Sequence, residues 1–123
     1  METVIGDKPH KRLIAWQRAI DFVEAMYRLT ERFPKEEQFG LVAQLRRASV
    51  SIASNIAEGA ARKTTKEHIQ FFYVVRGSVS EVDTQIEIAH RLNFISSEQR
   101  RATLQALDEI ARLMAGLIRS KQA

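Results

Sequence analysis

The sequence predicts an all-α protein that folds as an antiparallel, up-down-up-down four-helix bundle. Apolar residues recur at steps of three and four along the chain, which is the period of an amphipathic helix and not of a strand. Only two prolines and five glycines occur in 123 residues, so the elements between the breaks are long. The three breaks are short, and short connections make neighbouring helices antiparallel. We therefore expect a single bundle domain over residues 1–123, with residues 1–10 as a flexible N-terminal tail.

The first two helical patterns meet at Phe33-Pro34, because the residue before a proline avoids helical angles. The apolar stripe of the first pattern consists of Leu13, Trp16, Ile20, Val23 and Tyr27. The second pattern runs from about Glu37 to Arg62, and its stripe consists of Leu41, Leu45, Ala48, Ile52 and Ile56. We expect these stripes to face the core.

The third and fourth helical patterns each follow a capping box, in which two side chains three residues apart satisfy free backbone groups at a helix start. Thr64 with Glu67 begins the third helix, and Ser96 with Gln99 begins the fourth. The third stripe consists of Phe72, Val75, Val79, Val82, Ile86 and Ala89. The fourth stripe consists of Leu104, Leu107, Ala111, Met114 and Leu117.

The composition is that of a folded, soluble protein, with 45% hydrophobic and 28% charged residues. No apolar run approaches the roughly 18 residues that a membrane span needs. The absence of cysteine excludes disulfides and thiolate chemistry and fits a cytoplasmic location. A net charge of +4 permits nucleic-acid binding without demonstrating it.

Three groups of basic residues are denser than the rest of the chain. They lie at the N-terminus, in the second helix, and at the junction between the second and third helices. A solvated surface is one explanation for such groups, and binding of a polyanion is the other. The candidate nucleic-acid-binding residues are Lys11, Arg12, Arg46, Arg47, Arg62, Lys63 and Lys66.

The stretch SIASNIAEGAAR, residues 51–62, places an amide and a glycine on an otherwise apolar helix face. An unsatisfied buried amide costs about 1–3 kcal/mol, and a helical glycine costs up to ~1 kcal/mol against alanine. Asn55 and Gly59 therefore have a reason to be there. Three alternatives remain open: a polar network inside the monomer, a subunit interface between thin helices, or a ligand or nucleic-acid site.

The third helix repeats this pattern at Arg76-Gly77-Ser78, followed by Glu81. A glycine in the middle of a helix suggests close approach of another chain segment. A second contact face could be formed by Glu67, Tyr73, Val74, Glu81 and Ile88. The candidates for an oligomer interface or polar network are Ser51, Asn55, Glu58, Gly59, Arg76, Gly77, Ser78 and Glu81.

These residues also carry a family resemblance, of which the run Asn55 to Gly59 is the most specific part. The other matching pieces include Trp16-Gln17, Phe33-Pro34, Phe39-Gly40-Leu41, Gln44 to Ala48, Lys66-Glu67, Phe71 and Arg76-Gly77-Ser78. Over roughly residues 10–95 the chain resembles the four-helix bundle proteins encoded in intervening sequences of bacterial 23S rRNA genes. It is similar, more distantly, to the accessory variability determinant proteins of diversity-generating retroelements.

The resemblance implies a bundle that assembles into a ring, most often a pentamer, and it implies no established enzymatic activity. An association with RNA is implied by the genomic setting of the family. The retroelement proteins work with a reverse transcriptase and nucleic acid, so a polymerase of that kind is a second implied partner.

The sequence contains no complete motif for catalysis or for metal binding. Glu87 and His90 have the Glu-x-x-His spacing of di-iron bundles, but such a site needs two motifs and two further glutamates. Gly59 to Thr65 lacks the second glycine of a phosphate loop and a preceding strand. No Gly-x-Ser-x-Gly motif occurs, and the three histidines form no visible triad. We expect no enzyme activity, no metal and no cofactor.

Two functional hypotheses follow from these observations. In the first, the chain is an oligomeric, cytoplasmic protein that binds RNA or another nucleic acid through its basic clusters. In the second, it is a scaffold or adaptor whose function is protein contact, for example as an accessory subunit of a reverse transcriptase.

Overall fold

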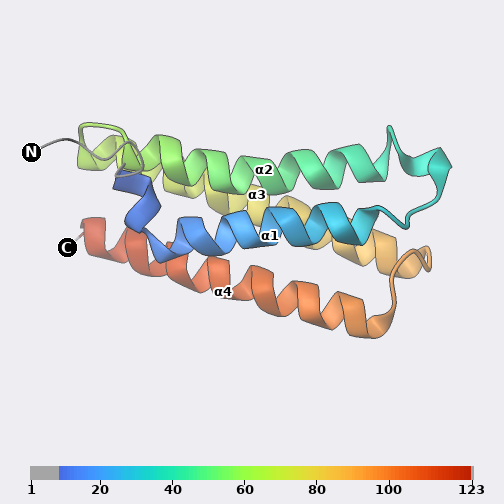
Figure 1. Ribbon diagram of the computed structural model, residues 1–123. Helices are drawn as coiled ribbons and strands as arrows, with labels where there is room; N and C mark the ends of the chain where they lie inside the picture. The colour runs from blue at the N-terminus through green and yellow to red at the C-terminus, as the bar shows by residue number, and fades with distance from the viewer. Residues whose placement is uncertain (1–8, 123) are drawn as a thin grey trace, which may run out of the picture.

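The computed structural model describes residues 9–122, except for the side chains of Lys11 and Arg12, and that range contains helices and no strand. Successive long helices run in opposite directions (Figure 1). These are α1 (Ile14–Thr30), α2 (Leu41–Ala60), α3 (Thr65–Arg91) and α4 (Ser97–Gln122). Two short 3₁₀-helices, η1 (Pro9–Arg12) and η2 (Lys35–Glu37), precede α1 and α2.

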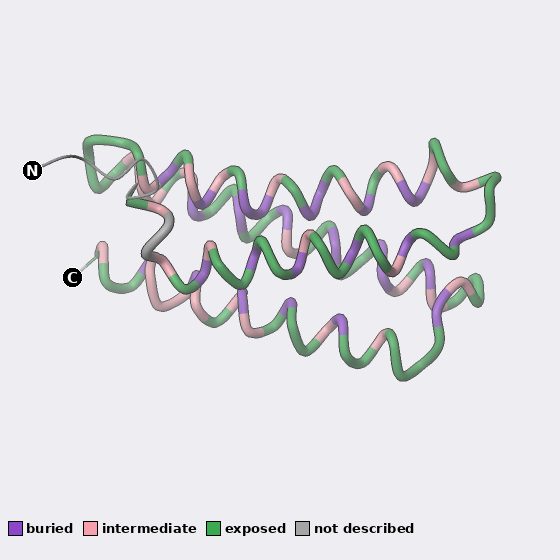
Figure 2. Tube along the Cα trace, in the orientation of Figure 1, coloured by how far each residue is buried: buried purple, intermediate pink, exposed green. Residues whose placement is uncertain are grey.

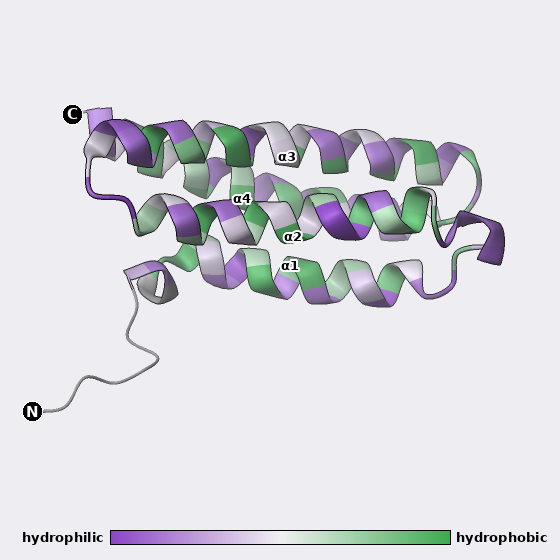
Figure 3. Ribbon diagram, turned by 90° about the horizontal axis from the view of Figure 1, so that it is seen from above, coloured by the Kyte–Doolittle hydropathy of each residue, from purple (hydrophilic) through white to green (hydrophobic). Residues whose placement is uncertain are grey.

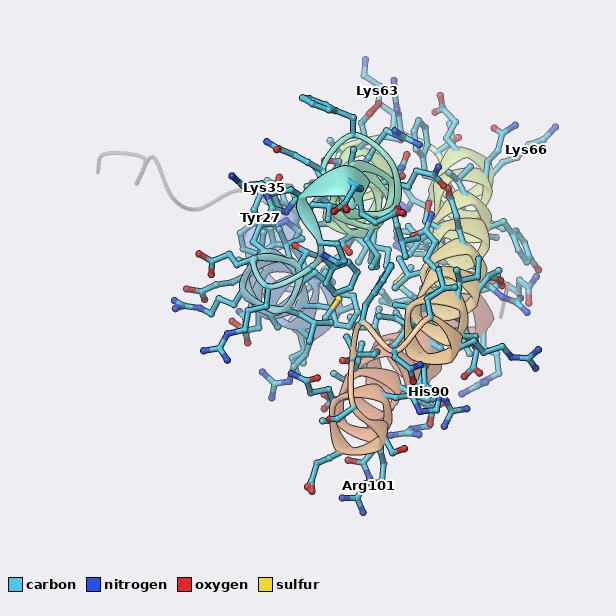
Figure 4. All side chains as sticks on the ribbon, turned by 90° about the vertical axis from the view of Figure 1, so that its right-hand side faces the viewer. Tyr27, Lys35, Lys63, Lys66, His90 and Arg101 are labelled. Carbon is cyan, nitrogen blue, oxygen red and sulfur yellow. The ribbon has the colours of Figure 1, made fainter. Side chains whose placement is uncertain are left out.

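Each long helix packs on its sequence neighbours, and α1 also packs on α4, so the four helices surround one core. The end-on view shows the four helix axes around this common centre (Figure 4). The all-α four-helix bundle is therefore confirmed. The assembly of copies into a ring stays a prediction.

Local hydrogen bonds fix where α3 and α4 begin and where α3 ends. The backbone N–H of Glu67 donates to Thr64 Oγ1 at 3.2 Å. Ser96 and Gln99 form a reciprocal capping box, with distances of 2.8 and 3.0 Å. At the other end of α3, Asn93 adopts φ 65°, a left-handed conformation that asparagine tolerates. This conformation lets the N–H of Phe94 donate to Ala89 O at 2.9 Å, which closes the helix.

The predicted core faces of α2 and α3 are confirmed. All five residues of the α2 stripe are buried, and in α3 only Val79 is half-buried (Figure 2). Both helices alternate between apolar and polar faces along their length (Figure 3). α2 lies between α1 and α3, and it is the helix whose core face the sequence defines most sharply.

The predicted core face of α1 was wrong. Ile20 and Tyr27 are 43% and 42% exposed, and the other three residues of that stripe are only half-buried. The residues that α1 buries are Ala15, Ala19, Phe22, Met26 and Thr30. This face lies roughly 100° around the helix from the predicted one, at 100° per residue. The small side chains of Ala15 and Ala19 allow α1 to approach the core closely.

The predicted core face of α4 was displaced in the same way, but less. Leu107 and Met114 are buried as predicted, whereas Leu104, Ala111 and Leu117 are half-buried. The remaining buried positions of α4 are Thr103, Ile110 and Ile118. The apolar arc of α4 is wide, so the sequence did not define its centre.

Candidate nucleic-acid interface

The Asn55 amide bonds within α2, whereas Ser51 and Gly59 contact α3 of the same protomer. Asn55 Nδ2 donates to Ser51 O at 2.9 Å and to Ser51 Oγ at 3.0 Å. The Ser51 hydroxyl lies 3.0 Å from the hydroxyl of Ser78 on α3. A Cβ on Gly59 would lie 2.8 Å from the Cβ of Phe71, so only glycine permits this helix approach. The candidates Ser51, Asn55, Gly59 and Ser78 thus make these contacts within one protomer.

The other four candidates for an interface lie on the open surface. Glu58 forms an ion pair with Arg62 at 3.2 Å, one turn along α2. The Arg76 guanidinium lies 5.4 Å from the centre of the Tyr73 ring. Gly77 has open space where a Cβ would stand, and the Glu81 carboxylate is exposed. Their participation in a subunit interface stays a prediction.

One polar residue of α3 was missed by the sequence reasoning. Gln85 is only 5% exposed, and its Nε2 lies 3.4 Å from Glu81 Oε2. Its Oε1 accepts no hydrogen bond from the part of the chain that the structure describes. Gln85 falls within the apolar arc of α3, and only the neighbouring apolar residues could have indicated its burial.

Arg46 closes the C-terminal end of α1. Its Nε donates to Thr30 Oγ1 at 2.9 Å and its Nη2 donates to Tyr27 O at 3.2 Å. The guanidinium also lies 4.4 Å from the centre of the Tyr27 ring. Arg46 therefore has intramolecular partners, whereas Arg47, its neighbour, is exposed.

Arg62, Lys63 and Lys66 lie at the turn between α2 and α3. Arg62 is paired with Glu58, and its guanidinium lies 4.7 Å from the centre of the Phe71 ring. Lys63 and Lys66 are exposed and form no ion pair within residues 9–122 (Figure 4). The His68 ring Nε2 lies 2.7 Å from Arg62 O, which ties the turn to the start of α3.

Two of the three basic groups lie at one end of the bundle. The α2–α3 turn lies near η1, which contains Lys11 and Arg12, and near the last turn of α4 (Figure 1). That last turn adds Arg119 and Lys121, which the sequence reasoning missed because α4 is distant in sequence. Arg47 is about 22 Å from Arg62 along α2, at 1.5 Å per residue. We call the set Lys11, Arg12, Arg62, Lys63, Lys66, Arg119 and Lys121 the basic end.

Metal and membrane features are absent from the residues that can be described. Between Pro9 and Gln122, no three His, Asp or Glu side chains gather as a metal site requires. Glu87 is instead paired with Arg100, whose Nε donates to it at 2.7 Å, and His90 Nε2 lies 3.1 Å from Ser97 Oγ. None of the described helices has the length and hydropathy to cross a membrane.

The sequence model of the family described as "23S rRNA-intervening sequence protein" matches residues 11–116. This chain belongs to that family. The match covers all four helices except the last residues of α4, so the predicted resemblance is confirmed and extends beyond residue 95. No curated protein matches the chain.

A solved structure of similar fold comes from Bacteroides thetaiotaomicron, where it is a protein of unknown function from the S23 ribosomal protein family. The two structures superpose with a TM-score of 0.77 at 19% sequence identity, over 85% of this chain and 98% of the other. At this identity the likeness shows the fold alone. Membership of the 23S rRNA-intervening sequence protein family thus rests on the sequence match.

Proposed function

We propose that this member of the 23S rRNA-intervening sequence protein family is a non-enzymatic, self-associating protein that binds structured RNA through its basic end. The observation that carries the proposal is the gathering of the basic end from η1, the α2–α3 turn and α4. Of the acids beside the α2–α3 turn, Glu58 is paired with Arg62 and Glu67 accepts a hydrogen bond from Thr64, and neither pairs with Lys63 or Lys66. Lys63 and Lys66 are thus available to phosphates.

The chemistry of the basic end favours recognition of charge and shape over reading of bases. Lysine and arginine neutralise phosphates and release counterions, so binding should weaken steeply as salt rises. Base stacking needs free aromatic faces. Phe72 is buried, Phe71 lies beneath Arg62, and Trp16 contacts the ring of His10 with 4.9 Å between centres. Arrays of phosphates on a folded RNA are therefore the fitting ligand.

The proposal includes self-association into a ring, with five subunits as the family resemblance implies. Several large apolar side chains outside the core support association. Those more than 40% exposed are Ile14, Ile20, Tyr27, Phe39, Tyr73, Val74, Ile88 and Leu92. Of these, Tyr73, Val74 and Ile88 fall on one face of α3, and exposed apolar side chains grouped on a helix face favour contact with another protein surface.

RNA binding can be tested by a mobility-shift titration with a structured RNA at low and high salt. The test variant is Lys63→Glu/Lys66→Glu, at the basic end. The control variant is Arg32→Glu/Arg91→Glu, which makes the same change in net charge on exposed residues at the other end of the bundle. We expect the first variant to lose most affinity and the slope of log K against log salt to fall by about 1–2.

Absence of binding by the wild-type protein at low salt would remove the proposal. Equal losses in the two variants would show that net charge, and not the basic end, determines binding. Circular dichroism of each variant should show unchanged helicity, because all four side chains are exposed.

A second candidate function is that of an adaptor for a protein such as a reverse transcriptase. It is favoured by the outward face of α3, where Tyr73, Val74 and Ile88 are 47%, 49% and 42% exposed. A pull-down from the native host with wild type and Val74→Glu would test it. Recovery of the same proteins by both forms would count against this face.

A further inference from the structure

Phe39 is the most exposed large apolar residue among those described, at 91%. It lies in the turn between η2 and α2, at the end of the bundle opposite the basic end (Figure 1). Hydrogen bonds hold this turn on both sides of Phe39. Gln38 N donates to Lys35 O at 3.1 Å, Gly40 N to Glu37 O at 3.0 Å. The Phe39 side chain is therefore displayed from an ordered backbone, which lowers the entropy lost on docking.

An apolar groove of about 500 Å³ lies at the other end, between the start of α1 and the end of α4. Gly116 contributes no side chain, which leaves the floor of the groove open. Apolar side chains from both helices line its walls, and Ile14 is 55% exposed. The lining residues used here are Leu13, Ile14, Leu113, Gly116 and Leu117.

The charges beside Phe39 and beside the groove are opposite. Glu36 is exposed in the Phe39 turn and has no ion pair within residues 9–122. The Arg119 Nη2 lies 3.9 Å from where a Cβ on Gly116 would stand, so its guanidinium borders the groove. Lys121 follows in the same turn of α4. The Phe39 turn carries two glutamates and one lysine, Lys35, so its net charge is negative. It is therefore complementary to the cationic rim of the groove when two copies meet end to end.

We infer that Phe39 of one copy docks into the α1–α4 groove of a second copy, with Glu36 beside Arg119. The two features cannot meet within one protomer, because the 20 residues of α2 separate them by about 30 Å. The contact joins two different surfaces, and each copy carries both of them. Repeating the same contact from copy to copy closes a ring if the rotation between neighbouring copies permits. This inference rests on the self-association in the proposed function and names its surfaces.

The first test uses the absence of cysteine from the chain. Phe39→Cys and Gly116→Cys proteins are prepared separately, mixed, and treated with a short thiol-specific bismaleimide. We expect a cross-linked dimer in the mixture, and none in a mixture of Phe39→Cys with Ala106→Cys, whose substitution lies at an exposed position in the middle of α4. Equal cross-linking in both mixtures, or in neither, would overturn the inference.

The second test measures association directly by sedimentation velocity over a concentration series. We expect Phe39→Ala and Gly116→Leu to weaken association at least about tenfold, as loss of an aromatic anchor or its pocket does. Gln105→Ala, at an exposed polar position of α4, serves as the control. Retention of wild-type assembly by both variants refutes this docking mode while self-association stands. A wild-type protein that is monomeric at micromolar concentration refutes both the docking mode and self-association. RNA binding by such a monomer would still be measured separately by the mobility-shift titration.

Discussion

Replacing Gly59 by alanine tests whether the close contact between α2 and α3 sets the stability of the bundle. The new Cβ would lie 2.8 Å from Phe71 Cβ and 3.0 Å from Phe72 Cε1. Carbon atoms prefer separations of about 3.5–4.0 Å, so the helices must part by several tenths of an ångström or more. Neither neighbour is the flexible end of a side chain. Overpacking of this kind costs about 1–3 kcal/mol.

A gain in helix propensity of up to ~1 kcal/mol opposes this cost, because alanine is the better helix former. The difference between these terms spans about 0–3 kcal/mol, so we expect Gly59→Ala to lower the free energy of unfolding by an amount near the middle of that range, roughly 1.5 kcal/mol. Gly77→Ala is the control, because no atom lies within 4 Å of its Cβ position. It should raise the free energy of unfolding by up to ~1 kcal/mol.

Urea denaturation followed by circular dichroism measures both variants, and an unchanged m-value shows that the unfolded state is comparable. The two glycines should shift the midpoint in opposite directions. Equal stabilisation by both substitutions would refute the assignment of Gly59 to a steric contact within the protomer. A Gly77→Ala protein that loses its assembly would instead place Gly77 at a subunit interface.

Three further substitutions probe individual contacts. Arg46→Ala should destabilise the protein by about 1–3 kcal/mol, because hydrogen bonds from a charged group to Thr30 and Tyr27 are lost; unchanged thermal stability with weakened RNA binding would contradict this. Asn55→Ala should lower stability by about 1 kcal/mol by removing its bonds to Ser51, with the mass in light scattering unchanged; a changed mass would place Asn55 between subunits. Ser96→Ala should cost about 1 kcal/mol in thermal unfolding by removing the cap of α4, and Ser97→Ala, whose hydroxyl bonds only His90, should cost less.

The sequence was sufficient for the core faces of α2 and α3 because the longest apolar stripe of each helix is also the one that packs against the neighbouring helices. α1 has two such stripes. The stripe that contains Trp16 and Ile20 carries the larger side chains, and the buried one includes Ala15 and Ala19. Hydrophobic periodicity favours the stripe with the larger apolar side chains. In the structure, α1 instead buries the face whose small side chains let it approach the neighbouring helices closely. This choice depends on the neighbouring helices and cannot be read from α1 alone.

The candidate site was predicted less completely than the fold. Arg62, Lys63 and Lys66 are close in sequence, so their grouping was visible. Arg119 and Lys121 join them only because an even number of antiparallel helices returns α4 to the same end. Arg46 was expected to be available to a ligand, yet its guanidinium is bonded to the end of α1. Partners of a surface arginine depend on tertiary contacts that charge patterning does not contain.

The position of the first and last described residues has a practical consequence for experiments with this protein. Pro9 and Gln122 both lie at the end of the bundle that carries the cationic side chains (Figure 1). A purification tag or fluorescent fusion joined directly to either of these residues would therefore sit beside the surface under study, and a polyhistidine tag would change its charge. Labels are better attached at an exposed position in the middle of α4, such as Ala106, which is remote from both ends of the bundle.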